Sequence, residues 1–144
     1  MRGARKTRIL FVCGGNTCRS PMAAAIANAK YRGVLVAESA GTAAWEADAN
    51  RLAVEVLRDR FGIQLRHHRP RDVQTIDVEG FDLVVAVDRS VAAELPQVQS
   101  GRLRVWAVRD PYLQGRAAYE AAADEILREI ENLVAGSCPL GGPR

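Results

Sequence analysis

The sequence predicts an α/β domain built on a parallel sheet, and three observations support this. Short apolar, β-branched segments alternate with longer segments of helical periodicity along the chain. A glycine-containing loop directly follows the first apolar segment and precedes a helix, which is a common place for an anion site. The 144 residues, 48% of them hydrophobic, suffice for one domain with its own core.

The first half of the chain is expected to contain two strands and two helices. Residues 9–12 are a short apolar run of the kind found in buried parallel strands. Ser20 and Pro21 are helix start signals ahead of an alanine-rich stretch, because proline fits the first helical turn. The expected elements are strand 8–12, helix 21–31, strand 34–38 and helix 50–61.

The second half continues the alternation after an irregular basic stretch that begins beyond Gly62. Strand 83–87, a short helix 90–95, strand 103–107 and helix 116–134 are expected. Strands separated by helices imply a parallel sheet with right-handed crossovers. Because no repeat or linker divides the chain, residues 1–144 are expected to form a single domain, with flexible ends at residues 1–7 and 136–144.

The segment from Cys13 to Ser20 carries the chemistry expected of this chain. It lies at a helix N-terminus, where free backbone N–H groups and the positive end of the helix dipole favour a phosphate-like anion. That position and the nearby cation also favour a thiolate, so Cys13 is a candidate nucleophile. Arg19 offers a planar fork that can bind two phosphoryl oxygens at once.

The remaining residues of the loop are expected to shape it. Gly14 and Gly15 permit backbone angles that turn successive amides inward. Asn16 can brace the turn by hydrogen-bonding its own backbone, and Ser20 can donate its hydroxyl to the sulfur of Cys13.

Other interpretations of the loop agree less well with the rest of the chain. A lone cysteine at a strand end is often a small buried hydrophobe, and two cysteines five positions apart could bind metal. The third cysteine is distant, at Cys138, and neither His67 nor His68 has zinc-ligand spacing, so no metal is expected. The chain also lacks the Gly-Lys-Ser/Thr and G-x-G-x-x-G patterns of nucleotide-binding loops.

Residues 12–21 resemble the phosphate-binding loop of the low-molecular-weight protein tyrosine phosphatases, and the resemblance covers nearly the whole chain. Residues 39–42 are similar to the segment after that family's second strand, and residues 81–88 to its third strand and the exit from it. Residues 110–112, Asp-Pro-Tyr, are similar to its general-acid loop. The resemblance implies a flavodoxin-like, three-layer α/β/α domain with four parallel strands in the order 2-1-3-4.

The resemblance also implies a mechanism and the residues that perform it. Cys13 is the nucleophile, Arg19 the phosphate clamp and Asp110 the general acid in a two-step hydrolysis through a cysteinyl-phosphate. No cofactor is implied, because Arg19 and the loop amides stabilise the charge. The residues expected to contact phosphate, another oxyanion or the phosphorylated protein substrate are Gly14, Gly15, Asn16, Thr17, Cys18, Ser20, Trp45 and Tyr112.

Asp110 is a candidate from its position alone. It follows the apolar run 103–108 and so lies at the carboxyl end of a strand, where ligands bind in open α/β sheets. An exposed aspartate that begins a turn before Pro111 is the simpler explanation. The thiol loop favours the catalytic one, because a leaving oxygen or nitrogen needs a proton.

The sequence leaves two substrates open, the phosphorylated side chains of tyrosine and arginine. Trp45 and Tyr112 can form aromatic walls around a phenolic ring, which favours phosphotyrosine. A threonine at the loop position of Thr17 resembles the family's bacterial branch that removes phosphate from protein arginine. The hydroxyl of Thr17 could hydrogen-bond a guanidinium. Alternatively the aromatic residues only pack, and Thr17 is a tolerated substitution. Phosphotyrosine is the main expectation and phosphoarginine the alternative.

Two other classes of protein are weaker alternatives. Arsenate reductases share a similar loop but shuttle a disulfide through further cysteines, for which Cys138 is the single candidate. A non-catalytic phosphoprotein-binding module would not need the nucleophile, clamp and acid together. Cys18 is either a packing residue or, as the resemblance suggests, the partner of Cys13 in a disulfide formed on oxidation.

The net charge and the cysteine content limit which binding partners and which cellular compartment are expected. The net charge is +3, but the arginines are interleaved with acidic residues, so neither nucleic acid nor membrane is an expected partner. The densest basic cluster, residues 66–71, is expected to be an exposed loop with solvated charges. An odd number of cysteines, no membrane-length apolar run and no secretion signal predict a cytoplasmic protein.

Overall fold

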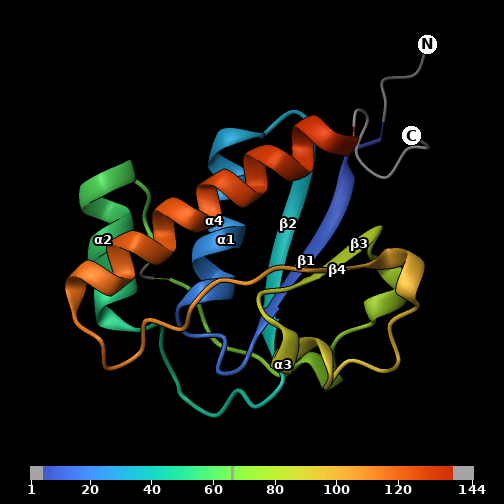
Figure 1. Ribbon diagram of the computed structural model, residues 1–144, viewed down its shortest axis with the longest axis horizontal. Coiled ribbons are helices and arrows are strands. Elements are labelled where there is room, and N and C mark those ends of the chain that lie inside the picture. The colour runs from blue at the N-terminus through green and yellow to red at the C-terminus, as the bar shows by residue number, and fades with distance from the viewer. Residues whose placement is uncertain (1–4, 66, 138–144) are drawn as a thin grey trace.

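A computed structural model describes residues 5–65 and 67–137 and contains a four-stranded parallel sheet (Figure 1). The strands are β1 (Thr7–Cys13), β2 (Leu35–Gly41), β3 (Leu83–Ala86) and β4 (Leu103–Val105). Their spatial order is β2-β1-β3-β4, so the order 2-1-3-4 implied by the family resemblance is confirmed. Every pair of neighbouring strands is parallel, with β1 at the centre between β2 and β3.

Helices cover the sheet. The α-helices are α1 (Arg19–Lys30), α2 (Arg51–Phe61), α3 (Arg89–Ala92) and α4 (Arg116–Ser137). The helices α1 and α4 pack together, α2 packs against both, and α3 lies against β3 (Figure 1). The connection from β1 to β2 runs in the opposite direction across the sheet from that between β3 and β4. Right-handed crossovers therefore place α1 and α3 on opposite faces.

The element boundaries differ from expectation in ways that matter for the site. Strand β2 continues three residues beyond Glu38, because Ser39, Ala40 and Gly41 pair with the end of β1. Helix α1 begins at Arg19, two residues before Pro21. Helix α4 extends to Ser137 and β1 begins at Thr7, so both residues are structured although they were expected in flexible ends.

The described residues also contain three short 3-10 helices: Val73–Thr75, Val78–Gly80 and Ser100–Arg102. The side chains of Asp72 and Asp77 accept hydrogen bonds from the first turns of two of them. These turns lie in the stretch that was expected to be irregular, because a single turn gives no periodic pattern in the sequence.

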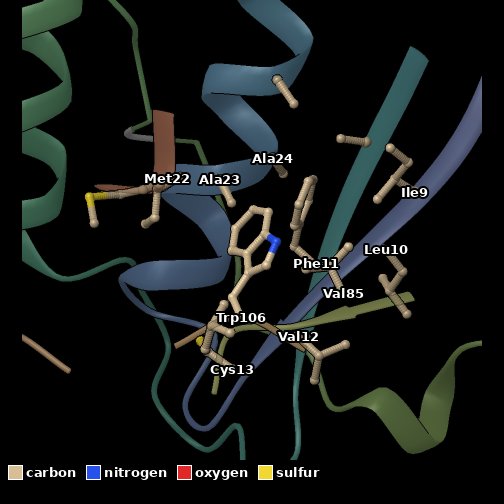
Figure 2. Packing of buried hydrophobic residues seen from close by; sticks show 14 of the residues in the cluster. Ile9, Leu10, Phe11, Val12, Cys13, Met22, Ala23, Ala24, Val85 and Trp106 are labelled. Carbon is tan, nitrogen blue, oxygen red and sulfur yellow. The ribbon is translucent and has the colours of Figure 1, made fainter. Parts of the chain in front are cut away.

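The hydrophobic core surrounds β1 and so fixes the start of the loop that begins at Cys13. Residues 9–12 are fully buried on both faces of the sheet, as expected for a central parallel strand. The rings of Phe11 and Trp106 pack at a tilt, with 5.4 Å between their centroids, and Met22 and Ala23 of α1 lie close by (Figure 2). Burying each large apolar side chain contributes about 1.5–3 kcal/mol, so the end of β1 is a firm support for Cys13.

No described helix has both the length and the apolar character needed to cross a membrane.

Candidate active site

The loop from Cys13 to Arg19 connects the carboxyl end of β1 to the first turn of α1. Cys18 takes the N-cap position and contributes no side-chain hydrogen bond there. The backbone N–H of Asn16 points at the sulfur of Cys13, with 3.3 Å between N and Sγ. The loop is therefore folded around the thiol, at the positive end of a 12-residue helix.

The thiol of Cys13 is buried, and its closest polar contact is with Ser20. Its sulfur is 2.9 Å from the hydroxyl oxygen of Ser20, as the sequence led us to expect. That oxygen also accepts a hydrogen bond from Asn16 Nδ2 at 2.8 Å and lies 3.3 Å from the carbonyl oxygen of Ala40. The Ser20 hydroxyl hydrogen is thus left to point toward either the sulfur or this carbonyl.

Asn16 is the residue that shapes the loop, and it does so differently from expectation. Its φ of 56° places it in the left-handed region, whereas neither Gly14 nor Gly15 has a positive φ. Its side chain does not hydrogen-bond its own backbone. Instead Nδ2 donates to Ser39 Oγ at 3.0 Å as well as to Ser20, and Oδ1 accepts from the Arg71 backbone N–H at 2.9 Å. The side chain is fully buried, so these contacts replace water completely.

A glycine outside the loop is required by the loop's position. A Cβ added to Gly41 would lie 2.5 Å from the carbonyl oxygen of Gly14, which is far inside van der Waals contact. The backbone N–H groups of Thr42 and Ala43 donate to the carbonyls of Cys13 and Gly14 at 3.0 and 2.9 Å. The end of β2 therefore packs directly beneath the loop.

Arg19 is almost completely buried, and its guanidinium is held from one side. Nη1 donates to Asp88 Oδ2 at 2.8 Å and to the carbonyl oxygen of Val108 at 2.7 Å. Nη2 lies 3.8 Å from Asp110 Oδ2, and the buried Nε has no hydrogen-bond partner among the described residues. The Nε–Nη2 edge of the fork is thus left for a ligand with two oxygens.

The carboxyl group of Asp88, which binds the Arg19 guanidinium, favours its ionised form. Burial opposes the charged carboxylate, but hydrogen bonds from Arg19, from the Val91 backbone N–H and from Ser90 outweigh burial. The pKa of Asp88 therefore lies below its ordinary value. The hydrogen bond from Nη1 to this carboxylate keeps the Arg19 guanidinium in one orientation.

Asp110 lines the same pocket as the loop and its side chain is half exposed. Its Oδ1 accepts a hydrogen bond from the Tyr112 backbone N–H at 3.1 Å, which closes a turn around buried Pro111. Next in the chain, Leu113 has a positive φ of 63° and an 82% exposed side chain. The carboxyl group is held near Arg19 but stays accessible from solvent.

A pocket of about 180 Å³ joins these groups. Its lining residues are Cys13, Gly14, Gly15, Thr17, Cys18, Arg19, Trp45, Glu46, Asp110 and Tyr112. All the predicted site residues except Asn16 and Ser20 therefore line it, and the side chains of those two support the loop through hydrogen bonds. Trp45 and Tyr112 are 82% and 48% exposed and form the outer walls of the pocket.

Cys18 is a free thiol, as is Cys13. Burial, followed by the neighbouring Cys13 and Asp110, raises the pKa of Cys18 to about 12, so it is protonated at neutral pH. Cys138, which was considered as a further thiol, lies outside the described residues.

Part of the basic cluster at residues 66–71 supports the loop, which corrects the expectation of solvated charges. His68 Nε2 is 2.8 Å from the backbone oxygen of Asn16, and the backbone N–H of Arg71 donates to the side chain of the same residue. Arg71 Nε also donates to the Ser39 backbone oxygen at 3.1 Å. Arg69 is exposed and lies 3.5 Å from Asp48, while Arg66 lies outside the described residues.

Several supporting residues were not found from the sequence. Ser39 lies near the carboxyl end of β2 and Asp88 lies just after β3, and the strand-end rule used for Asp110 could have selected them. His68, Arg71 and Glu46 lie in segments without periodicity, so no local signal connects them to the loop.

An α/β sheet with a thiol loop at the carboxyl end of its central strand, a buried arginine and a carboxylate at the pocket mouth is typical of a cysteine-dependent phosphatase. Comparison with known proteins agrees. The family model described as low molecular weight phosphotyrosine protein phosphatase matches residues 8–137, and the chain belongs to this family. It is therefore an enzyme of the hydrolase class, from a family that acts on phosphorylated proteins.

Individual relatives support the same family. A probable low molecular weight protein-tyrosine-phosphatase, EpsP of Ralstonia nicotianae, is 33% identical over 136 residues, covering 85% of this chain and 90% of that protein. A protein-arginine-phosphatase of Geobacillus stearothermophilus is 49% identical over 139 residues, covering 88% of this chain and 93% of that protein. The low molecular weight protein tyrosine phosphatase from T. tengcongensis superimposes with a TM-score of 0.85 at 36% identity, covering 91% and 99%.

Proposed function

We propose that the chain hydrolyses phosphate from protein side chains through a cysteinyl-phosphate on Cys13, with phosphotyrosine and phosphoarginine as the two candidate substrates. The observation that carries this proposal is the Arg19 guanidinium, which is buried, held by Asp88 through Nη1, and left with its Nε unpartnered beside the thiol loop. A phosphoryl group has the charge and the pair of oxygens that such an edge binds.

The proposed chemistry has two steps. The Cys13 sulfur attacks phosphorus as the bond to the leaving oxygen breaks, and Asp110 gives that oxygen its proton. Asp110 then takes a proton from a water molecule, which attacks phosphorus and breaks the sulfur–phosphorus bond to release phosphate. Arg19 and the inward N–H groups of the loop stabilise the charge on the phosphoryl oxygens in both steps.

The remaining residues have supporting roles in this proposal. Ser20 donates to the Cys13 sulfur and Asn16 holds the loop, whereas Gly14 and Gly15 bring the backbone close to the phosphate. Trp45 and Tyr112, at the pocket mouth, would enclose a phenolic ring between their faces.

The lysine variant of Arg19 tests the carrying observation. Arg19→Lys keeps the positive charge but removes the planar fork, so kcat for p-nitrophenyl phosphate should fall about 10²- to 10³-fold. Arg109→Lys, an exposed arginine outside this pocket, is the matched control and should keep the wild-type kcat. An Arg19→Lys enzyme as fast as the wild type would contradict the proposed clamp.

Phosphoarginine is a second candidate substrate, and a specific observation favours it. Thr17 lines the pocket, where its hydroxyl can accept a hydrogen bond from a guanidinium. The protein-arginine-phosphatase at 49% identity adds support from the comparisons. Turnover of phosphotyrosine and phosphoarginine peptides that are otherwise identical decides between the two. A Thr17→Ile variant that leaves their ratio unchanged would remove Thr17 as the determinant.

Cys18 and the compartment belong to the same proposal. Cys18 has two alternative roles here, as a packing residue of the pocket wall or as the partner of Cys13 in a disulfide formed on oxidation. The free thiols of both residues suit a reducing cytoplasm.

A further inference from the structure

Glu46 is the one charged residue of the pocket lining that the proposed mechanism does not use. The charged residues of the lining are Arg19, Asp110 and Glu46. Arg19 is buried at the floor, whereas Asp110 and Glu46 lie toward solvent. Glu46 is exposed, and it has no ion-pair partner within residues 5–65 and 67–137. The outer part of the pocket therefore carries two carboxylates and no cation.

A second carboxylate is unfavourable for a phosphotyrosine pocket. The phosphotyrosine side chain carries only negative charge, at its phosphate, and its ring is neutral. A carboxylate beside the ring repels the incoming dianion and gains nothing in return. One carboxylate suffices for proton transfer, so Glu46 has no use in the hydrolysis of a phenyl phosphate.

A phosphorylated guanidinium has the opposite charge distribution. Its phosphoryl group would sit over Cys13 and Arg19, and its positive charge is shared by the nitrogens farther from phosphorus. These nitrogens would occupy the middle and mouth of the pocket, between Thr17 and Glu46. Planar N–H groups match a carboxylate well, because two parallel hydrogen bonds can form.

We propose that Glu46 selects phosphoarginine over phosphotyrosine by pairing with the guanidinium at the pocket mouth. This inference rests on the proposed function and specifies its substrate class. Trp45, next in the chain, would cover one face of the guanidinium while Glu46 binds its edge. Exposure limits the effect: the pair is partly solvated, so the selectivity is modest and decreases as salt is added.

Kinetics of a neutral variant test this proposal. Glu46→Gln should lower kcat/KM for a phosphoarginine peptide about two- to fivefold, and should leave that for the matching phosphotyrosine peptide equal or higher. Glu46→Lys should change the ratio further in the same direction. Glu94→Gln removes an exposed carboxylate outside the pocket and should leave the ratio at the wild-type value.

The outcomes separate this inference from the proposed function. An equal change for both peptides, or no change in their ratio, would overturn the role of Glu46, and so would a wild-type enzyme that hydrolyses only the phosphotyrosine peptide. Hydrolysis of p-nitrophenyl phosphate that requires Cys13 would still uphold the phosphatase assignment in each of these cases. Turnover that survives Cys13→Ser would reject the assignment itself.

Discussion

At the floor of the pocket Cys13 and Arg19 are 2% and 5% exposed, whereas at its mouth Trp45 is 82% exposed and the Asp110 side chain 57%. Nearly every polar atom of the floor has a partner: Ser20 beside the sulfur, Asp88 beside the guanidinium. The side chains at the pocket mouth have few hydrogen-bond partners, and the bond that Asp110 accepts comes from Tyr112, two residues along the chain.

This difference separates two tasks. Binding a phosphoryl group requires fixed donors in a site that excludes water, because preorganised groups then stabilise charge without reorganising. Admitting a large substrate and moving a proton requires side chains that solvent and substrate can reach. Substitutions at the floor should therefore affect every substrate, and substitutions at the mouth should distinguish between substrates.

Loss of the nucleophile should have the largest effect. Cys13→Ser replaces the sulfur nucleophile with a hydroxyl, which is a much weaker nucleophile, so kcat should fall on the order of 10⁵-fold for every substrate. Binding of vanadate should persist, because the amides and Arg19 are unchanged. Steady-state kinetics and an anion titration by fluorescence measure both. Residual turnover near the wild-type value would place the nucleophile elsewhere.

Loss of the general acid should be next and should depend on the substrate. Asp110→Asn cannot donate a proton, so turnover of a substrate with a poor leaving group should fall about 10²- to 10⁴-fold. p-Nitrophenyl phosphate, with a good leaving group, should lose much less. An equal loss for both substrates would remove Asp110 from this role.

Removal of the loop support should cost stability as well as activity. Asn16→Gly keeps a residue suited to the positive φ but leaves Ser39 Oγ and the Arg71 N–H without their partner, which should destabilise the fold by about 2–3 kcal/mol. Asn16→Ala adds the strain of a left-handed alanine and should be less stable still. Urea unfolding monitored by tryptophan fluorescence measures both. A glycine variant as stable as wild type would show that the buried hydrogen bonds contribute nothing.

The smallest expected effect is a pH dependence at His68. Burial lowers the pKa of His68 below its ordinary value of 6.5, with smaller effects from Arg71 and Arg69, so the folded state favours the neutral ring. The unfolded chain therefore binds more protons, and stability should decrease as pH falls from about 6.5 through the lowered pKa. His68→Asn should lose this component of the pH dependence, whereas His67→Asn, at an exposed neighbour, should keep it. Identical pH profiles for wild type and His68→Asn would contradict the prediction.

The sequence by itself determined the class of fold and the chemical groups. The alternation of apolar segments with helical segments predicts the parallel sheet. The carboxyl ends of parallel strands lie at one edge of the sheet, so residues that follow strands, such as the thiol loop and Asp110, could be selected as site residues. The tertiary structure alone decided how these groups are held. Asn16 bonds to Ser39 and Arg71, which lie 23 and 55 residues away, and Arg19 bonds to Asp88, 69 residues away. Glu46 likewise joins the pocket mouth from a segment without periodicity. Local patterns report which faces of an element are buried, whereas hydrogen bonds between distant segments depend on the packing of the whole sheet.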